Sequence, residues 1–126
     1  MDWFGFLLPR INPRRRPAES LSPPHEGDLD RLEELRQQGS RLDLPHPVRG
    51  FLAFATEAAA REAAETLDKE SFSCSVRASQ DGAWVTTAVT RLVPSPGAIT
   101  RLREQLEAVT RAHGGSYRGW DAPVVY

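Results

Sequence analysis

Cysteine and histidine, from which most protein metal centres and many nucleophilic sites are built, are scarce in this sequence. Cys74 is the only cysteine, and the three histidines, His25, His46 and His113, lie in different segments. A single cysteine excludes an intramolecular disulfide and a cysteine-based metal site, and it is typical of a reducing compartment. The HExxH, GxSxG, Walker and GxGxxG patterns are also missing. We therefore expect a cytoplasmic protein that is not an enzyme and that holds no cofactor and no metal.

A strong excess of charge of one sign is missing as well. The 126 residues carry a net charge of −1 and provide one domain of ordinary size with a tail. Residues 28–126 hold 14 acidic and 12 basic side chains, a net of −2, whereas four arginines make the N-terminal segment basic. This near-neutral domain lacks the basic composition that phosphate binding requires.

Residues 1–27 are predicted to be a disordered tail. Its apolar start is far shorter than the roughly 20 residues of a spanning helix and has no small-residue cleavage pattern after it, so we expect neither an anchor nor a secretion signal. Five prolines follow among polar residues, a composition that cannot bury enough apolar surface to become ordered. Weak contact with an anionic membrane surface and contact with protein both remain open, through Trp3, Phe4, Phe6, Arg14, Arg15 and Arg16.

Residues 28–46 are predicted to form a short helix and a linker. Asp28 is expected to cap the helix and Gly39 to end it. The apolar side of this helix is expected to hold Leu29, Leu32 and Leu35. Two prolines, Pro45 and Pro47, close the segment, since neither is expected inside a central strand.

Residues 47–126 alternate between strand and helix patterns. The apolar run 48–55 predicts a strand buried on both faces, and 57–69 predicts a helix lined with alanine. Residues 71–77 alternate, with Phe72, Cys74 and Val76 on one face, and a turn at 80–82 leads into a strand over 84–92. This pattern indicates a hairpin with one face that can be solvated.

The last third of the chain reads as an amphipathic helix followed by a strand. Ser95 is expected to cap the helix, Pro96 to fill its first position and Gly114 to take the left-handed conformation at its end. Its polar side, expected to face water, comprises Arg101, Arg103, Glu104, Glu107 and Arg111. Residues 116–123 are predicted to form the final strand.

This order of elements is the split βαβ of a ferredoxin-like α+β sandwich, a βαββαβ domain in which two helices cover one face of a four-stranded antiparallel sheet. Such sheets often bind RNA by stacking bases on exposed aromatic side chains. Phe51 and Trp84 are the aromatic residues that this interpretation requires. An RNA-binding ferredoxin-like module therefore stands as the alternative function.

Three stretches carry a resemblance to a known family. They are Asp81-Gly-Ala-Trp84-Val, Thr90-Arg91-Leu-Val-Pro94 and His113-Gly-Gly-Ser-Tyr117-Arg-Gly-Trp120-Asp. Together with the helix before the last stretch, they resemble the RraB family of ribonuclease E inhibitors over about residues 47–125. The resemblance implies the same ferredoxin-like fold and a non-catalytic protein that binds an endoribonuclease of the ribonuclease E type and lowers RNA cleavage. Familiar members are strongly acidic, whereas this chain is nearly neutral.

The candidate partner-binding residues come from the matched stretches. Tyrosine and tryptophan are common at interface hot spots, although core packing is the favoured role for Tyr117 and Trp120. For His113, a structural role at the helix end, where its side chain would bond the last carbonyl groups, is favoured. The full set is Trp84, His113, Tyr117, Arg118, Trp120 and Asp121.

Overall fold

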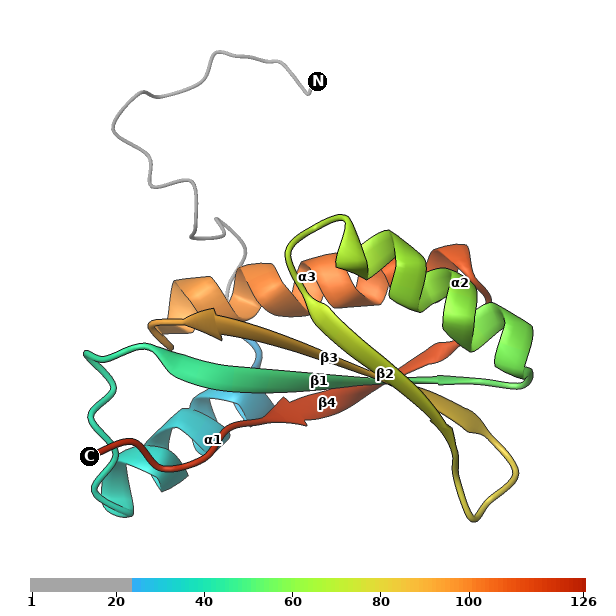
Figure 1. Ribbon diagram of the computed structural model, residues 1–126. Helices are drawn as coiled ribbons and strands as arrows, with labels where there is room; N and C mark the ends of the chain where they lie inside the picture. Colours follow the sequence, from blue (N-terminus) through green and yellow to red (C-terminus); the bar gives the residue numbers. More distant parts are fainter. Residues whose placement is uncertain (1–23) are drawn as a thin grey trace.

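The computed structural model describes residues 24–126 as three helices and a four-stranded antiparallel sheet (Figure 1). The elements in chain order are α1 (Glu26–Gln37), β1 (His46–Phe54), α2 (Glu57–Asp68), β2 (Ser73–Ala78), β3 (Trp84–Leu92), α3 (Pro96–Ala112) and β4 (Ser116–Asp121). The strand order β2-β3-β1-β4 confirms the predicted ferredoxin-like α+β sandwich. The predicted tail contacts of Trp3, Phe4, Phe6, Arg14, Arg15 and Arg16 lie outside the described residues.

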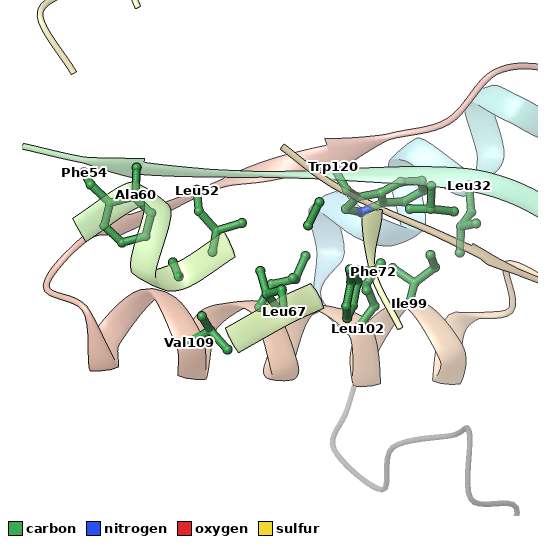
Figure 2. Close-up of a cluster of buried hydrophobic side chains, with 14 of the residues drawn as sticks. Leu32, Leu52, Phe54, Ala60, Leu67, Phe72, Ile99, Leu102, Val109 and Trp120 are labelled. Carbon is green, nitrogen blue, oxygen red and sulfur yellow. The ribbon is translucent and has the colours of Figure 1, made fainter. Parts of the chain in front are cut away.

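The core lies between one face of the sheet and the helices α2 and α3 (Figure 2). Alternate residues of β1 and β3 point into it, among them Val48, Leu52 and Ala88, which are fully buried. Thr86 shows the same direction, because its hydroxyl donates a hydrogen bond to the Ala60 carbonyl of α2. The other set of alternate residues lies on the second face of the sheet, which α2 and α3 do not cover and which is open among residues 24–126 (Figure 1).

Helix α1 begins earlier than predicted and has a different cap. Its N-cap is His25, whose Nδ1 accepts a hydrogen bond from the Gly27 N–H. The prediction that Asp28 caps the helix was wrong, since Asp28 lies in the first turn with its side chain buried. Leu32 and Leu35 join the core as expected, but Leu29 is 41% exposed because it falls outside the narrow stripe that meets the domain.

Pro47 lies inside β1, a central strand, contrary to expectation. It pairs with Arg91 of β3, but the pairing of β1 with β4 begins only at Arg49. A proline is tolerated here because one side of β1 has no neighbouring strand at this point, so no ladder hydrogen bond is lost there. β1 is therefore central only from Arg49 onwards.

The C-terminal segment is attached through a buried histidine. His46 is fully buried, and its Nδ1 lies 2.8 Å from the Leu44 carbonyl, which can only accept. In the neutral ring Nδ1 therefore carries the proton, and Nε2 accepts a hydrogen bond of 2.6 Å from the Ser40 hydroxyl. Ser40 Oγ in turn accepts from the Val125 N–H at 2.9 Å. This histidine is thus satisfied by structural partners alone.

Candidate functional site

The reversal from α3 to β4 depends on two adjacent glycines with different functions. Gly114 has φ +74°, the left-handed conformation predicted for the residue after the helix. Gly115 lies so close to the end of β1 that an added Cβ would overlap the Ala53 carbonyl oxygen and the Phe54 ring. The first glycine is needed for its backbone conformation and the second for its close approach. Each glycine of the Gly-Gly pair therefore has a structural role.

His113 joins the end of α3 to α2. Its backbone N–H caps the helix by donating to the carbonyls of Val109 and Thr110. The expectation that its side chain bonds the last carbonyls was wrong, because the ring turns towards α2 instead. Nε2 lies 3.5 Å from Thr66 Oγ1, and Nδ1 lies 3.7 Å from Glu62 Oε1. His113 therefore has structural contacts with both α3 and α2.

Tyr117 and Trp120 both face the helices, although they are three residues apart on β4. A register shift lies between Gly50 and Leu52, so that Trp120 pairs opposite Gly50 and Tyr117 opposite Leu52. Gly119, with φ +103°, provides the backbone conformation for this β-bulge. Trp120 is buried and Tyr117 packs against the core, which confirms core packing as the role of both rings.

A buried ion pair holds α1 against α3 and β4. Asp28, only 3% exposed, accepts bidentate hydrogen bonds of 2.7 and 2.8 Å from the Arg103 guanidinium and one of 2.9 Å from Trp120 Nε1. Burial by itself would raise the pKa of Asp28. The hydrogen bonds from Arg103 and Trp120 and the guanidinium charge outweigh it and lower the pKa below its ordinary value. The prediction that Arg103 faces water was wrong, because its side chain is 17% exposed and held in this ion pair.

Tyr117 lies under the same arginine. The Arg103 guanidinium carbon is 5.1 Å from the centre of the Tyr117 ring, a cation–π contact. The phenol oxygen is buried and has no hydrogen-bond partner among the described residues. Burial raises the pKa of this phenol. The hydroxyl is therefore the one polar group at this corner whose place the fold does not explain.

Trp84 does not lie on the open face of the sheet. It pairs with Phe54 at the beginning of β3, on the side of the helices, and packs against the core. On the open face, Phe51 is the aromatic residue that remains, with the Arg49 guanidinium 5.8 Å from its centre. The pair of exposed aromatic side chains on which the RNA-binding alternative depends is not brought together.

The remaining two candidates, Arg118 and Asp121, point to the open face and form ion pairs there. Asp121 accepts bidentate hydrogen bonds of 2.8 and 2.9 Å from Arg49 of the neighbouring strand. Arg118 reaches Asp81 in the β2–β3 turn at 3.2 Å. The six candidates thus lie in different places: Arg118 and Asp121 on the open face, Tyr117 and Trp120 at the α1–α3 corner, Trp84 on the helix side of the sheet, and His113 beside α2.

The chemistry of the other candidate groups is limited. Burial and the nearby Asp68 carboxylate raise the pKa of the Cys74 thiol to about 12, which keeps it in the unreactive protonated form. Among residues 24–126, no three His, Cys, Asp or Glu side chains gather in a way that could hold a metal ion. Within the same range, no helix is long and apolar enough to cross a bilayer.

A comparison with known families matches residues 25–122 to one family, described as RraB, regulator of ribonuclease activity B. The match includes α1, which the resemblance seen in the sequence had left out, and it ends just after β4. No curated protein matches the chain. The match thus spans every helix and strand of the described structure.

Proposed function

The chain belongs to the RraB family of regulators of ribonuclease activity, and we propose that it is a non-catalytic protein ligand of an endoribonuclease of the ribonuclease E type. By binding the nuclease it lowers RNA cleavage, and it acts in the cytoplasm. The observation that carries this proposal is the family match over the whole described fold, including the α1–α3 corner with its buried ion pair.

The positions of the candidate residues divide their proposed roles. Arg118 and Asp121 lie on the open face with polar groups at the surface, so we assign direct contact with the nuclease to them. Trp84 and His113 lie on the helix side of the sheet, so we assign them structural roles. Tyr117 and Trp120 act indirectly, because Trp120 ties β4 to Asp28 of α1 and the Tyr117 ring packs under Arg103 of α3. Buried rings position a surface without touching the partner.

The alternative function is binding to RNA, which the arginines on the sheet would favour because they attract phosphate groups. Two features support the protein ligand instead. The open face offers a single aromatic ring for stacking, and two carboxylates, Asp81 and Asp121, lie among its arginines. Single-stranded RNA recognition relies on several stacking rings and a continuous basic track. Neither is present on this face of the described chain.

The proposal is tested by titrating the purified protein into a ribonuclease E cleavage assay at two RNA concentrations. A protein ligand lowers cleavage according to the ratio of inhibitor to enzyme, so the two curves coincide. Masking of RNA scales with the ratio of inhibitor to substrate, and the curves then separate. Curves that separate, or an absence of inhibition, would contradict the proposal.

Variants make the same assay specific to the surface. Removing Arg118 and Asp121 together (Arg118→Ala/Asp121→Ala) is expected to weaken inhibition. The matched control is Arg41→Ala/Asp43→Ala, which removes an exposed arginine and an exposed aspartate that pair with each other at 2.9 Å outside the sheet. Both variants leave the net charge unchanged, since each loses one arginine and one aspartate.

A further inference from the structure

The charges of this domain are divided between its sheet and two of its helices. The four strands together hold four arginines and one carboxylate, a net of +3. Helix α1 holds five acidic and two basic residues, and α2 holds four acidic residues and one basic, so each has a net of −3. The net charge of the domain is therefore near zero because a basic sheet and acidic helices balance each other. The four arginines of the sheet lie on its open face.

Two of the four strand arginines have no ion-pair partner among residues 24–126. Arg49 and Arg118 already hold carboxylates, Asp121 and Asp81. Arg77 of β2 and Arg91 of β3 are both exposed, and neither forms an ion pair or hydrogen bond with another described residue. The bidentate pair of Arg49 with Asp121 shows which ligand the guanidinium groups of this face accept, namely a carboxylate in the plane of the fork.

A shallow hollow lies on the open face beside Arg77. Its volume is about 460 Å³, and Arg49 and Arg77 stand at its border. The floor is formed by half-buried side chains of the two central strands, Phe51, Val85, Thr87 and Val89. An apolar floor with guanidinium groups around it suits an amino-acid side chain flanked by carboxylates better than a sugar-phosphate backbone.

We infer that the open face binds an extended acidic segment of a protein partner. One carboxylate pairs with Arg77, a second pairs with Arg91, and an apolar side chain between them rests on the hollow. Arg77 lies opposite Val85, and Arg91 is six residues further along β3. At about 3.3 Å per strand residue this separation is roughly 20 Å. The matching segment is therefore extended, with acidic residues about six positions apart.

Charge distinguishes this occupant from the others that the chain offers. The N-terminal segment of the chain carries four arginines, which the basic face repels. RNA meets the two carboxylates already on the face and finds one aromatic ring. A partner segment with two spaced acidic residues needs no stacking rings, and its carboxylates pair with Arg77 and Arg91, whereas Asp81 and Asp121 are already paired with Arg118 and Arg49. We place the acidic segment on the ribonuclease, and this part of the inference rests on the proposed function.

The probe is a synthetic peptide with two glutamates six residues apart and leucine between them, and its control is the same peptide with lysines in place of the glutamates. Binding to the full chain is measured by fluorescence anisotropy at low salt. Arg77→Ala/Arg91→Ala is expected to weaken binding of the acidic peptide about tenfold through the loss of two charge-assisted contacts. Arg31→Ala/Arg111→Ala removes the same charge from α1 and α3 and is expected to leave binding unchanged.

Three results would overturn the inference. The first is equal binding of the acidic peptide by both double variants or tighter binding of the lysine peptide. The second is binding of oligouridylate, in place of the peptide, through Arg77 and Arg91. The third is a dimer in sedimentation that the Arg77→Ala/Arg91→Ala change dissolves, which would assign the face to the acidic helices of a second copy. Failure of the proposed function looks different, since the wild-type protein would then bind the peptide but leave RNA cleavage unchanged.

Discussion

Asp28 and Trp120, which are 92 positions apart in the chain, are joined by a hydrogen bond of 2.9 Å from the indole Nε1 to the carboxylate Oδ1. Arg103 binds the same carboxylate, so one buried aspartate ties α1, α3 and β4 together. The tryptophan lies in one of the three stretches by which the sequence resembles the family, and its partner lies outside these stretches. The helix before the sandwich is therefore a built-in part of the domain.

Replacing Asp28 by alanine is expected to lower the free energy of unfolding by about 3 kcal/mol. The change leaves the Arg103 guanidinium and the indole N–H buried without their acceptor, which costs more than the ion pair itself contributes. For a domain of this size the melting temperature should fall by about 10 °C or more. Asp30→Ala is the control, because this aspartate is exposed on the same helix. Equal losses in the two variants, measured by urea denaturation, would contradict the role of the buried pair.

The same ion pair makes stability depend on pH in the acid range. The pKa of Asp28 in the folded protein lies below its ordinary value of 3.8, so its contribution is complete above that value. The contribution is lost as the pH falls through the lowered folded pKa, because the unfolded state takes up the proton first. Denaturation of the wild-type protein and of Asp28→Asn should therefore give a difference in unfolding free energy that shrinks below about pH 4. A difference that stays constant down to pH 2 would contradict the lowered pKa.

Features set by neighbouring residues could be predicted from the sequence. The cap of α3 by Ser95 depends on the Ala98 N–H three residues away, and the end of the helix depends on Gly114 alone. The hairpin turn likewise follows from Gly82, which has φ +88°. Such features were predicted correctly because the interacting groups lie within a few residues of one another.

Features set by distant residues could not be predicted from the sequence. Arg103 lies on the polar side of its helix by periodicity, and only the arrival of Asp28 from 75 positions away turns it inwards. The bulge at Gly119 breaks the period of two, so alternation alone could not place Tyr117 and Trp120 on one face. The arginines of the open face are spread over four strands and become one surface only when the sheet forms.

Gly115→Ala is expected to be more destabilising than Gly114→Ala. The new methyl group at position 115 would overlap the Ala53 carbonyl and the buried Phe54 ring, and relieving this costs about 3 kcal/mol. At position 114 no atom lies within 4 Å of the added Cβ, so the only cost is that of placing alanine in the left-handed backbone conformation, about 1 kcal/mol. Chemical denaturation of both variants measures the difference. The reverse order would show that the turn can move away from β1.

Deleting residues 1–23 is expected to leave the melting temperature unchanged, because the Pro-rich composition provides little apolar surface to bury. Deletion of residues 1–27 is the informative comparison. It also removes His25, whose side chain caps α1, and the first turn next to the buried Asp28, at a cost of about 1 kcal/mol for the cap alone. A large loss already in the shorter deletion, seen by thermal denaturation, would place Trp3, Phe4 and Phe6 in the folded core.

Tyr117→Phe is expected to leave the free energy of unfolding unchanged or to raise it by up to about 1 kcal/mol. The phenol oxygen is buried without a hydrogen-bond partner, so the wild-type protein bears its desolvation cost, whereas phenylalanine keeps the ring under Arg103. Tyr126→Phe is the control, since that ring is 85% exposed. A clear loss of stability on removing the Tyr117 hydroxyl would show that it has a partner. If Tyr117→Phe is as stable as the wild-type protein but inhibits the ribonuclease less, the hydroxyl finds its partner only in the complex.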